Sequence, residues 1–270
     1  MRVGYCVPIT PQMASFRLRV AIPAKHAAYT YEIGATGDKT FFYKHFETDA
    51  HIAKNCGPFV YDVVNDHFRG KYAAEYHGMC SIADRITVAS EAMAEIVYEH
   101  TGRDATVISD PYENIESAPL CVGNEVLWFG HSANLASLLP HLETIDPNYR
   151  MVICSNVPSA TAQWSQRNEA NCLYSAGVVL MTGNNPGASA NRVVKALRAG
   201  RFVVAPENCA ESWRELAPYI HIGDVAEGIA WAFNNREEAC KKIKQGQEVV
   251  AQKFAPSSIG AKWTDLFASI

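Results

Sequence analysis

Positive and polar residues gather around one loop in the second half of the sequence, where a phosphate group could bind. The loop spans residues 181–190, contains two glycines and leads into a predicted helix over residues 189–199. Arg192 and Lys195 lie three residues apart and therefore share a face of that helix. Loop amides, a helix N-terminus and two cations together suit a diphosphate, whereas the alternative is a tight loop with solvated charges. The candidate diphosphate-binding residues are Gly187, Ala188, Ser189, Asn191, Arg192 and Lys195.

A second glycine-containing junction lies earlier in the same half. Residues 130–134 follow a predicted strand over 126–129 and open a predicted helix over 133–145. Glycine permits a close backbone approach, and the N–H groups of a first helical turn point at whatever is bound. This junction adds four candidates for the same ligand: Gly130, His131, Ser132 and Asn134.

Asp62, Asp66 and His67 form the one dense cluster of Asp and His residues in the sequence. A histidine beside a carboxylate is held in one tautomer and can move protons near neutral pH. Asp66 and His67 are therefore candidate catalytic residues. The pattern also fits a metal site, but it offers only three ligands without a partner spacing, so no metal is expected.

A third candidate group follows the first predicted strands. Ser15 can cap a helix whose first turn carries Arg17 and Arg19, where the helix dipole already favours an anion. The alternative is that either arginine is a solvated surface residue. Lys44 and His45 follow the second predicted strand, and we assign all five residues to the acceptor or phosphate side.

Two common nucleotide motifs are missing from the sequence. The loop over 181–190 does not end in Gly-Lys-Ser or Gly-Lys-Thr, and no G-x-G-x-x-G follows a predicted strand. The usual grounds for an ATPase or an NAD enzyme are therefore absent.

Short β-branched or aromatic runs alternate with helix-period segments, which predicts an α/β fold with parallel sheets. Segment 110–119 is polar and bounded by prolines, as expected of an interdomain linker. We predict two Rossmann-like, doubly wound domains at 1–115 and 116–254, and a C-terminal helix at 255–270 that packs back on the first domain. The predicted strands are 2–7, 40–44, 58–64, 85–88, 105–109, 126–129, 150–154, 177–181, 202–205 and 219–222. The further predicted helices are 15–28, 47–56, 90–101, 211–216, one from about 224, and 236–254.

Composition excludes several classes of protein. The chain has 270 residues, of which 48% are hydrophobic and 19% charged, and its net charge is −4. This balance indicates a globular protein and disfavours a broad nucleic-acid surface. The eight cysteines show no C-x-x-C spacing. Reduced cysteines, an N-terminus interrupted by prolines and the lack of a long apolar run predict a cytoplasmic protein without a transmembrane segment.

Six segments, taken in order, carry a resemblance to a known family. They are Ser15–Arg19 (SFRLR), Tyr61–Phe68, Ala83–Ser90 (ADRITVAS), Val107–Tyr112 (VISDPY), Leu127–His131 (LWFGH) and Ala199–Ala205 (AGRFVVA). Their order and spacing resemble nucleotide-sugar glycosyltransferases of the GT-B arrangement, with two domains facing across a cleft, and are most similar to the retaining family 4, or group 1.

The resemblance implies a function for each half. The second domain would hold a nucleotide-sugar donor as co-substrate without a further cofactor, and the first would hold the acceptor, with Asp66 and His67 facing the transferred sugar. It implies transfer of a hexosyl or related group with retention of the anomeric configuration. No metal is required if the amides, Arg192 and Lys195 stabilise the departing diphosphate. Gly187 and Lys195 occupy the positions of two glutamates in that family. Donor choice could therefore differ, or activity could be lost.

The sequence leaves the partner molecules open. A glycan, a lipid-linked sugar, a small molecule and a modified nucleic-acid base are all compatible acceptors. The alternative functions are a non-catalytic two-domain module that binds a nucleotide or sugar, and another two-domain enzyme such as a sugar epimerase or a phosphate-using transferase.

Overall fold

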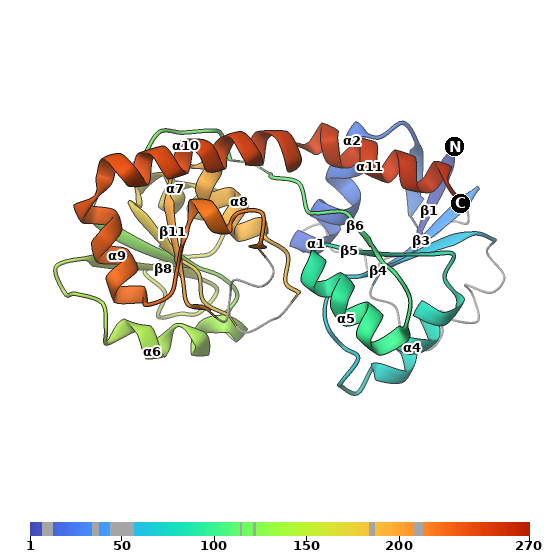
Figure 1. Ribbon diagram of the computed structural model, residues 1–270, viewed down its shortest axis with the longest axis horizontal. Coiled ribbons are helices and arrows are strands. Elements are labelled where there is room, and N and C mark those ends of the chain that lie inside the picture. Colours follow the sequence, from blue (N-terminus) through green and yellow to red (C-terminus); the bar gives the residue numbers. More distant parts are fainter. Residues whose placement is uncertain are drawn as a thin grey trace. The chain divides into compact units, whose positions relative to one another are not determined.

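The structure, a computed structural model, describes residues 1–6, 13–33, 38–43, 57–113, 115–120, 123–183, 187–207 and 213–270 (Figure 1). The chain divides into two compact units. Unit 1 comprises Met1–Glu113, Pro186–Ala190 and Lys253–Ile270. Unit 2 comprises Asn114–Asn185 and Asn191–Gln252. A short segment from the middle of the second half and the C-terminal tail therefore belong with the N-terminal part of the chain.

Unit 1 is built on a parallel sheet whose described strands are ordered β2-β1-β3-β4-β5-β6. The strands are β1 (Arg2–Cys6), β2 (Thr30–Ile33), β3 (Lys39–Tyr43), β4 (Phe59–Val63), β5 (Arg85–Val88) and β6 (Thr106–Val107). All five residues of β4 are buried, as expected of an apolar strand covered on both faces. The chain reverses its direction of strand addition between β1 and β3, and the residues that follow both strands lie outside the described ranges.

The helices of unit 1 cover this sheet. They are α1 (Ala14–Phe16), the π-helical turn η1 (Arg17–Ala21), α2 (Ile22–His26), α4 (Ala73–Ile82), α5 (Glu91–Thr101) and α11 (Pro256–Ala268). Ile259, Trp263 and Phe267 recur every four residues on α11 and join one apolar cluster with Tyr5 and Phe41. The Trp263 and Phe41 ring centres are 5.3 Å apart. The prediction that the C-terminal helix packs on the first domain is confirmed.

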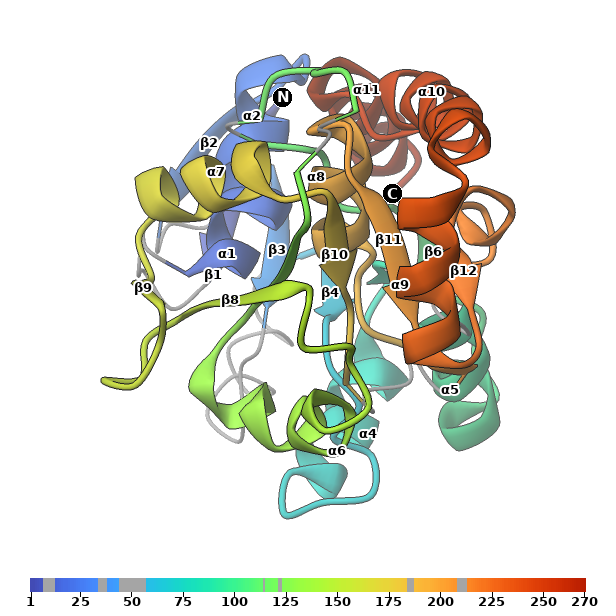
Figure 2. The same cartoon turned by 90° about the vertical axis from the view of Figure 1, so that its left-hand side faces the viewer.

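Unit 2 has a second parallel sheet, whose described strands are ordered β12-β11-β10-β7-β8-β9. The strands are β7 (Glu125–Phe129), β8 (Arg150–Ser155), β9 (Ala162–Gln163), β10 (Val178–Leu180), β11 (Phe202–Ala205) and β12 (His221–Ile222). In Figure 2 the neighbouring strands β10 and β11 of this sheet run upright, and β8 runs at an angle to them. Here the direction of strand addition reverses between β7 and β10.

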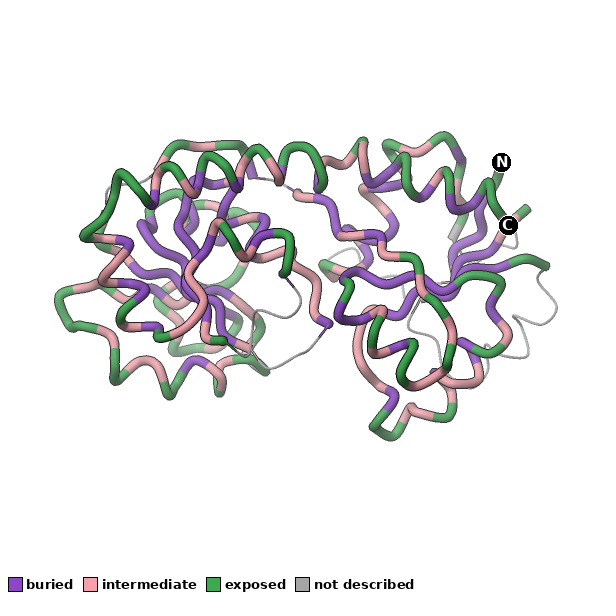
Figure 3. The backbone as a smooth tube through the Cα atoms, in the orientation of Figure 1, coloured by how far each residue is buried: buried purple, intermediate pink, exposed green. Residues whose placement is uncertain are grey.

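The helices of unit 2 flank its sheet. They are the 3₁₀ helix η2 (Ser132–Ser137), α6 (Leu139–Leu142), α7 (Gln166–Ser175), α8 (Asn191–Arg198), the 3₁₀ helix η4 (Ala217–Tyr219), α9 (Val225–Asn234) and α10 (Arg236–Lys253). Figure 3 shows the strands of each unit as its most buried segments, with exposed residues on the outer helix faces. Among the described residues, no helix combines the length and apolar character needed to cross a bilayer.

The fold class predicted from the sequence, two doubly wound α/β sheets, is confirmed. Among the described elements, strands β2 and β9, helices α4 and α7 and the 3₁₀ helix η4 were not predicted. The helix predicted over 133–145 is instead a 3₁₀ helix followed by the short α6, because Pro140 lacks the N–H that a continuous helix needs. The helix predicted over 47–56 lies outside the described residues, as does the start of the one predicted over 211–216.

The segment predicted as a polar linker is not solvent-exposed at its centre. Asp110 and Glu113 are each 4% exposed, and Ile115 is 5% exposed. Both carboxylates are buried because each has an arginine partner within unit 1. The described part of the segment is therefore largely buried as far as Ile115, whereas Glu116, Ser117 and Pro119 are exposed.

Candidate functional site

The reversal between β7 and β10 marks the natural binding position in unit 2. In open parallel sheets, ligands bind outside the carboxyl ends of the strands at the point where strand order reverses. Phe129 is the last residue of β7, and Thr182 lies two residues beyond β10. The residues that follow these two strands are the groups that a ligand at this point would meet.

Arg192 spans the two strand ends from the first turn of α8. Its Nη1 donates to the Phe129 carbonyl oxygen at 3.2 Å, and its Nη2 donates to the Thr182 carbonyl oxygen at 3.4 Å. Both of these acceptors are uncharged backbone carbonyls, and the two hydrogen bonds orient the guanidinium. The side chain is half-buried, which strengthens its attraction for an anion relative to that of a fully solvated arginine.

Two glycines border this guanidinium, Gly130 through close packing and Gly183 through its backbone conformation. A Cβ atom at Gly130 would lie 3.2 Å from Arg192 Nη1 and 3.3 Å from the Trp128 ring. A Cβ atom at Gly183 would lie 3.7 Å from Arg192 Nη2, and Gly183 has a φ of +147°, a conformation that favours glycine. The sequence predicted Gly130 as a site residue, and in the structure Gly130 packs against Arg192.

Thr182 fixes the end of β10 through its side chain. Its buried hydroxyl accepts a hydrogen bond from Trp128 Nε1 at 2.8 Å and lies 2.9 Å from the Ser137 hydroxyl. This network joins the ends of β7 and β10 to η2. The carbonyl group that binds Arg192 therefore belongs to a residue with little freedom to move.

His131, Ser132 and Asn134 lie at the start of η2, beside this position. His131 Nδ1 accepts a hydrogen bond from the Ala133 N–H at 3.1 Å and caps the helix. A neutral imidazole that accepts at Nδ1 carries its proton on Nε2. The Ser132 N–H donates to Asn156 Oδ1 at 2.8 Å. Asn156 follows β8 and was not identified from the sequence, because a single asparagine after a strand carries no pattern.

Lys195 is held by a carboxylate that the sequence did not identify. Its Nζ lies 2.7 Å from Glu169 Oε1, and Trp164 Nε1 donates to Glu169 Oε2 at 2.8 Å. Glu169 is only 8% exposed, whereas Trp164 is 39% exposed. Lys195 is therefore half of an ion pair, and the helical spacing of the two cations gave no indication of its partner Glu169.

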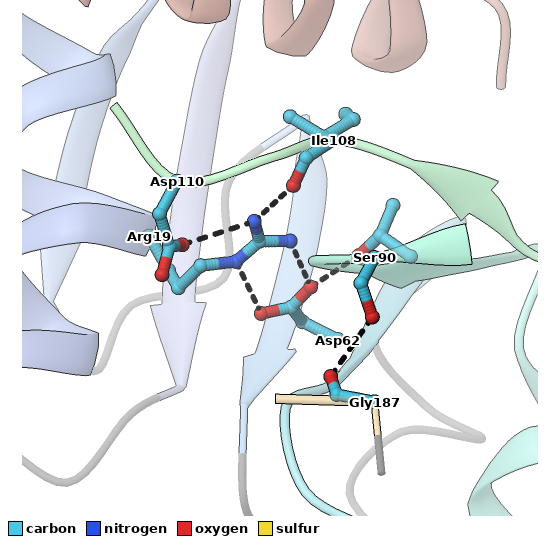
Figure 4. Close-up of polar contacts among 7 residues, drawn as sticks. Arg19, Asp62, Ser90, Ile108, Asp110 and Gly187 are labelled. Atoms are coloured by element: carbon cyan, nitrogen blue, oxygen red, sulfur yellow. Dashed lines mark hydrogen bonds and ion pairs between the residues drawn. The ribbon is translucent and has the colours of Figure 1, made fainter. Parts of the chain in front are cut away.

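Arg17 and Arg19 in unit 1 differ from their prediction as an anion-binding pair. Arg17 makes two hydrogen bonds of 2.7 Å to the Glu113 carboxylate. Arg19 is 1% exposed, binds Asp62 at 2.6 and 2.9 Å, and also donates to the Ile108 carbonyl (Figure 4). Ser15 is not the helix cap, because α1 begins at Ala14. Both cations are balanced by acidic residues of their own unit.

Burial and neighbouring charge compete at this network. Burial alone would lower the pKa of Arg19, but Asp62 and Asp110 raise the pKa above its usual value, so the guanidinium stays charged. Burial raises the pKa of Asp110, and Arg19 opposes that shift. Thr87 donates from its hydroxyl to Asp62 at 2.7 Å. The network is a satisfied, buried ionic cluster.

The Asp and His cluster of the sequence is divided in the structure. Asp62 belongs to the buried network, whereas Asp66 accepts from the Phe68 N–H at 3.1 Å in the loop after β4. The His67 ring packs edge-on against Tyr76, with ring centres 5.1 Å apart. Asp66 and His67 are half-buried, and Lys44 and His45 lie outside the described residues. Within the described ranges, no group of three or more Asp, Glu, His and Cys residues is arranged to hold a metal ion.

The candidate ligand residues are therefore distributed between the units. Gly130, His131, Ser132, Asn134, Asn191, Arg192 and Lys195 belong to unit 2. Gly187, Ala188 and Ser189 belong to unit 1 although they follow β10 in the sequence. The structure thus separates the loop from the helix that it precedes.

Comparisons with solved structures place this architecture. No family model matches the chain, and no curated protein matches its sequence. The structure of HepE from Anabaena, in complex with UDP and glucose, has a TM-score of 0.79 over 100% of both chains at 12% identity. The chain has the GT-B fold. A glycosyltransferase from Rickettsia africae matches with a TM-score of 0.67 at 10% identity, covering 99% of this chain and 98% of the other.

A third similar structure has the same fold with a different sequence. Sucrose-phosphate synthase from Thermosynechococcus elongatus matches with a TM-score of 0.63 at 13% identity, covering 97% of this chain and 80% of that one. The sequence therefore differs from these glycosyltransferases at most positions while the order of helices and strands is shared. The expected resemblance to GT-B glycosyltransferases is confirmed.

Proposed function

We propose that the chain is a glycosyltransferase that takes a sugar from a nucleotide-sugar donor and passes it to an acceptor hydroxyl. The observation that carries the proposal is Arg192, which spans the strand ends at the reversal point of unit 2 with a half-buried charge. The match to HepE along its whole length supports it, because that structure holds UDP and glucose. We assign the diphosphate to Arg192 and to the first turn of α8.

The chemistry of transfer explains why a fixed cation is useful. The bond between the anomeric carbon and the terminal phosphate oxygen breaks, and its electron pair leaves with the nucleoside diphosphate. The acceptor oxygen forms the new bond to carbon, and its proton passes to the departing phosphate. Negative charge on the departing phosphate grows as the old bond breaks, so Arg192 stabilises the transition state more than the bound donor.

We further propose that the transfer is metal-independent and retains the configuration of the anomeric carbon. Arg192 and the amides at the start of α8 supply positive charge where the phosphate leaves. Addition of EDTA should therefore leave the rate unchanged. Retention rests on the resemblance to family 4, and proton NMR of the product distinguishes it from inversion.

Calorimetric titration with UDP, GDP and ADP tests the donor site. We expect one of them to bind the wild-type chain and Arg192→Ala to weaken that binding by about 10- to 100-fold, the loss expected for a charge-assisted hydrogen bond of roughly 1.5–3 kcal/mol. Arg150→Ala is the matched control. Arg150 is likewise an arginine of unit 2, but it is paired with Glu125 and lies at the opposite, amino end of β8.

The results of these experiments distinguish a glycosyltransferase from a non-catalytic binding module. Equal affinity in Arg192→Ala and Arg150→Ala would contradict the donor-site assignment. Slow release of glucose from UDP-glucose by the wild-type chain supports a transferase, because a catalyst that lacks its acceptor transfers the sugar to water. Binding without any release of sugar from a panel of nucleotide sugars would instead identify a non-catalytic binding module.

A further inference from the structure

Residues 187–190 are fastened to unit 1, although β10 precedes them and α8 follows them in the sequence. The segment leads directly into α8, whose second residue is Arg192. The last residue of the segment, Ala190, is thus joined by one peptide bond to Asn191, the first residue of α8. Three contacts within unit 1 hold them.

The first contact is a hydrogen bond from Ser90. Its hydroxyl donates to the Gly187 carbonyl oxygen at 2.9 Å and accepts from the Met93 N–H at 3.2 Å, so that it also caps α5 (Figure 4). A hydroxyl has one proton to donate and two lone pairs, so both bonds form together. Ser90 is 5% exposed, and its bond to Gly187 is therefore shielded from competing water.

The second contact is close packing at Gly187 itself. Gly187 has a φ of +81°, in the left-handed region. A Cβ atom there would lie 2.6 Å from Met93 Cε and 3.2 Å from Met93 Cα. Both the backbone conformation and the space against α5 therefore require glycine.

The third contact ties the segment to the buried ionic network. The Ser189 hydroxyl donates a hydrogen bond to the Asp110 carboxylate. Asp110 in turn pairs with Arg19 at 3.3 Å, and Arg19 binds Asp62. Ser189 is therefore bound to a carboxylate that Arg19 holds in place. Asp110 accepts from one charged donor, Arg19, and from one neutral donor, Ser189.

We infer that Ser90 is a positioning residue for the nucleotide-sugar donor: by holding Gly187 it seats the segment that starts α8 and so places Arg192. This inference rests on the proposed function. Ser90 does not need to touch the donor, because its effect passes through the backbone of residues 187–190. If the donor binds only to molecules in which residues 187–190 are held against unit 1, the measured affinity is proportional to the fraction of molecules in that conformation.

The test compares Ser90→Ala with Ser90→Thr and with a control. Ser90→Ala removes both hydrogen bonds, and Ser90→Thr retains the hydroxyl. Asp224→Ala is the control for a lost helix cap, because Asp224 caps α9 by accepting from the Glu227 N–H at 2.8 Å. Two properties are measured for each variant: amide hydrogen exchange of residues 187–195 without ligand, and calorimetric affinity for UDP, GDP or ADP, whichever the wild-type chain binds.

We expect Ser90→Ala to speed exchange in residues 187–190 and to weaken nucleotide binding by about fivefold, the effect of one hydrogen bond. Ser90→Thr should restore both properties, and Asp224→Ala should lower the melting temperature without changing either one. If amide exchange is unchanged in Ser90→Ala, Ser90 does not hold residues 187–190. If exchange becomes faster but the nucleotide affinity stays at the wild-type value, Ser90 is not a positioning residue for the donor. A wild-type chain that binds no nucleoside diphosphate would refute the proposed function and with it the role of Ser90, while the exchange data would still show whether the segment is fastened.

Discussion

The two sheets of this molecule use arginine in opposite ways. In unit 1, Arg19 is buried and faces two carboxylates, Asp62 and Asp110. In unit 2, Arg192 is half-buried and its oriented hydrogen bonds go to two backbone carbonyls. Both residues lie on a helix near the carboxyl ends of parallel strands, and the sequence assigned both to anion binding. The acceptors around a cation, rather than its place after a strand, distinguish a buried ion pair from a guanidinium that is oriented by backbone carbonyls.

The largest effect expected from this contrast is on stability. Arg19→Met leaves Asp62 and Asp110 buried without their cation, and we expect the free energy of unfolding to fall by about 3–5 kcal/mol. Urea unfolding followed by circular dichroism measures it. Arg150→Met removes a cation that is 67% exposed from its pair with Glu125, and it should cost less than about 1 kcal/mol. A similar small loss for both variants would show that the buried network contributes little.

Glycine at the ends of two helices gives a second comparison between the units. Gly102 ends α5 with a φ of +66°, and Gly200 follows α8 with a φ of +76°. A Cβ atom at Gly102 would meet nothing within 4 Å, whereas one at Gly200 would lie 2.2 Å from the Ala118 carbonyl oxygen and 2.3 Å from that of Pro119. The two positions share their backbone conformation and differ in their surroundings.

Alanine at these two positions should therefore have unequal effects. Gly102→Ala should cost about 1 kcal/mol of folding free energy, because only the left-handed conformation is penalised. Gly200→Ala should cost about 3 kcal/mol, because backbone atoms must also move apart. Thermal unfolding of both variants tests this expectation. If the two melting temperatures fall equally, the segment that contains Ala118 and Pro119 yields without cost.

Several parts of the fold could be predicted because one local pattern sufficed. The strand Phe202–Ala205 is a short run of buried apolar residues, and α11 repeats a large apolar residue every four positions. Helix α7 was missed because its sequence, QRNEANCLYS, is mostly polar and buries only Glu169 and Leu173. Strand β2 was missed because a four-residue edge strand that contains a threonine and a glutamate resembles a loop.

The candidate site shows a different limit of the sequence. Gly130 and Arg192 were found from local signals, a glycine after a strand and a cation at a helix start. The partners that determine the role of each cation were not found, because they lie far away in sequence: Asp62 is 43 residues from Arg19, and Glu169 is 26 residues from Lys195. Pairings at such separations depend on the order of strands in the sheet, which spacing along the chain does not reveal.

Lys195 provides the third and smallest contrast. Because its Nζ lies 2.7 Å from the buried Glu169 carboxylate, we propose that it acts mainly by holding that group. Lys195→Met should lower the free energy of unfolding by about 2 kcal/mol, because a buried carboxylate loses its cation. Urea unfolding of Lys195→Met and of Arg192→Ala tests this expectation. The loss of stability should be larger in Lys195→Met, because the acceptors of Arg192 described above are backbone carbonyls and not carboxylates.

The double variant Lys195→Met/Glu169→Gln separates a structural role from direct phosphate binding. Removing the carboxylate charge together with the cation leaves no unpaired buried charge, so most of the lost stability should return. If Lys195 only holds Glu169, the affinity for the nucleoside diphosphate should return as well. If the free energy of unfolding returns while the affinity for the nucleoside diphosphate stays low, Lys195 contacts the phosphate directly. The two cations three residues apart on one helix face would then form a binding site, as the sequence predicted.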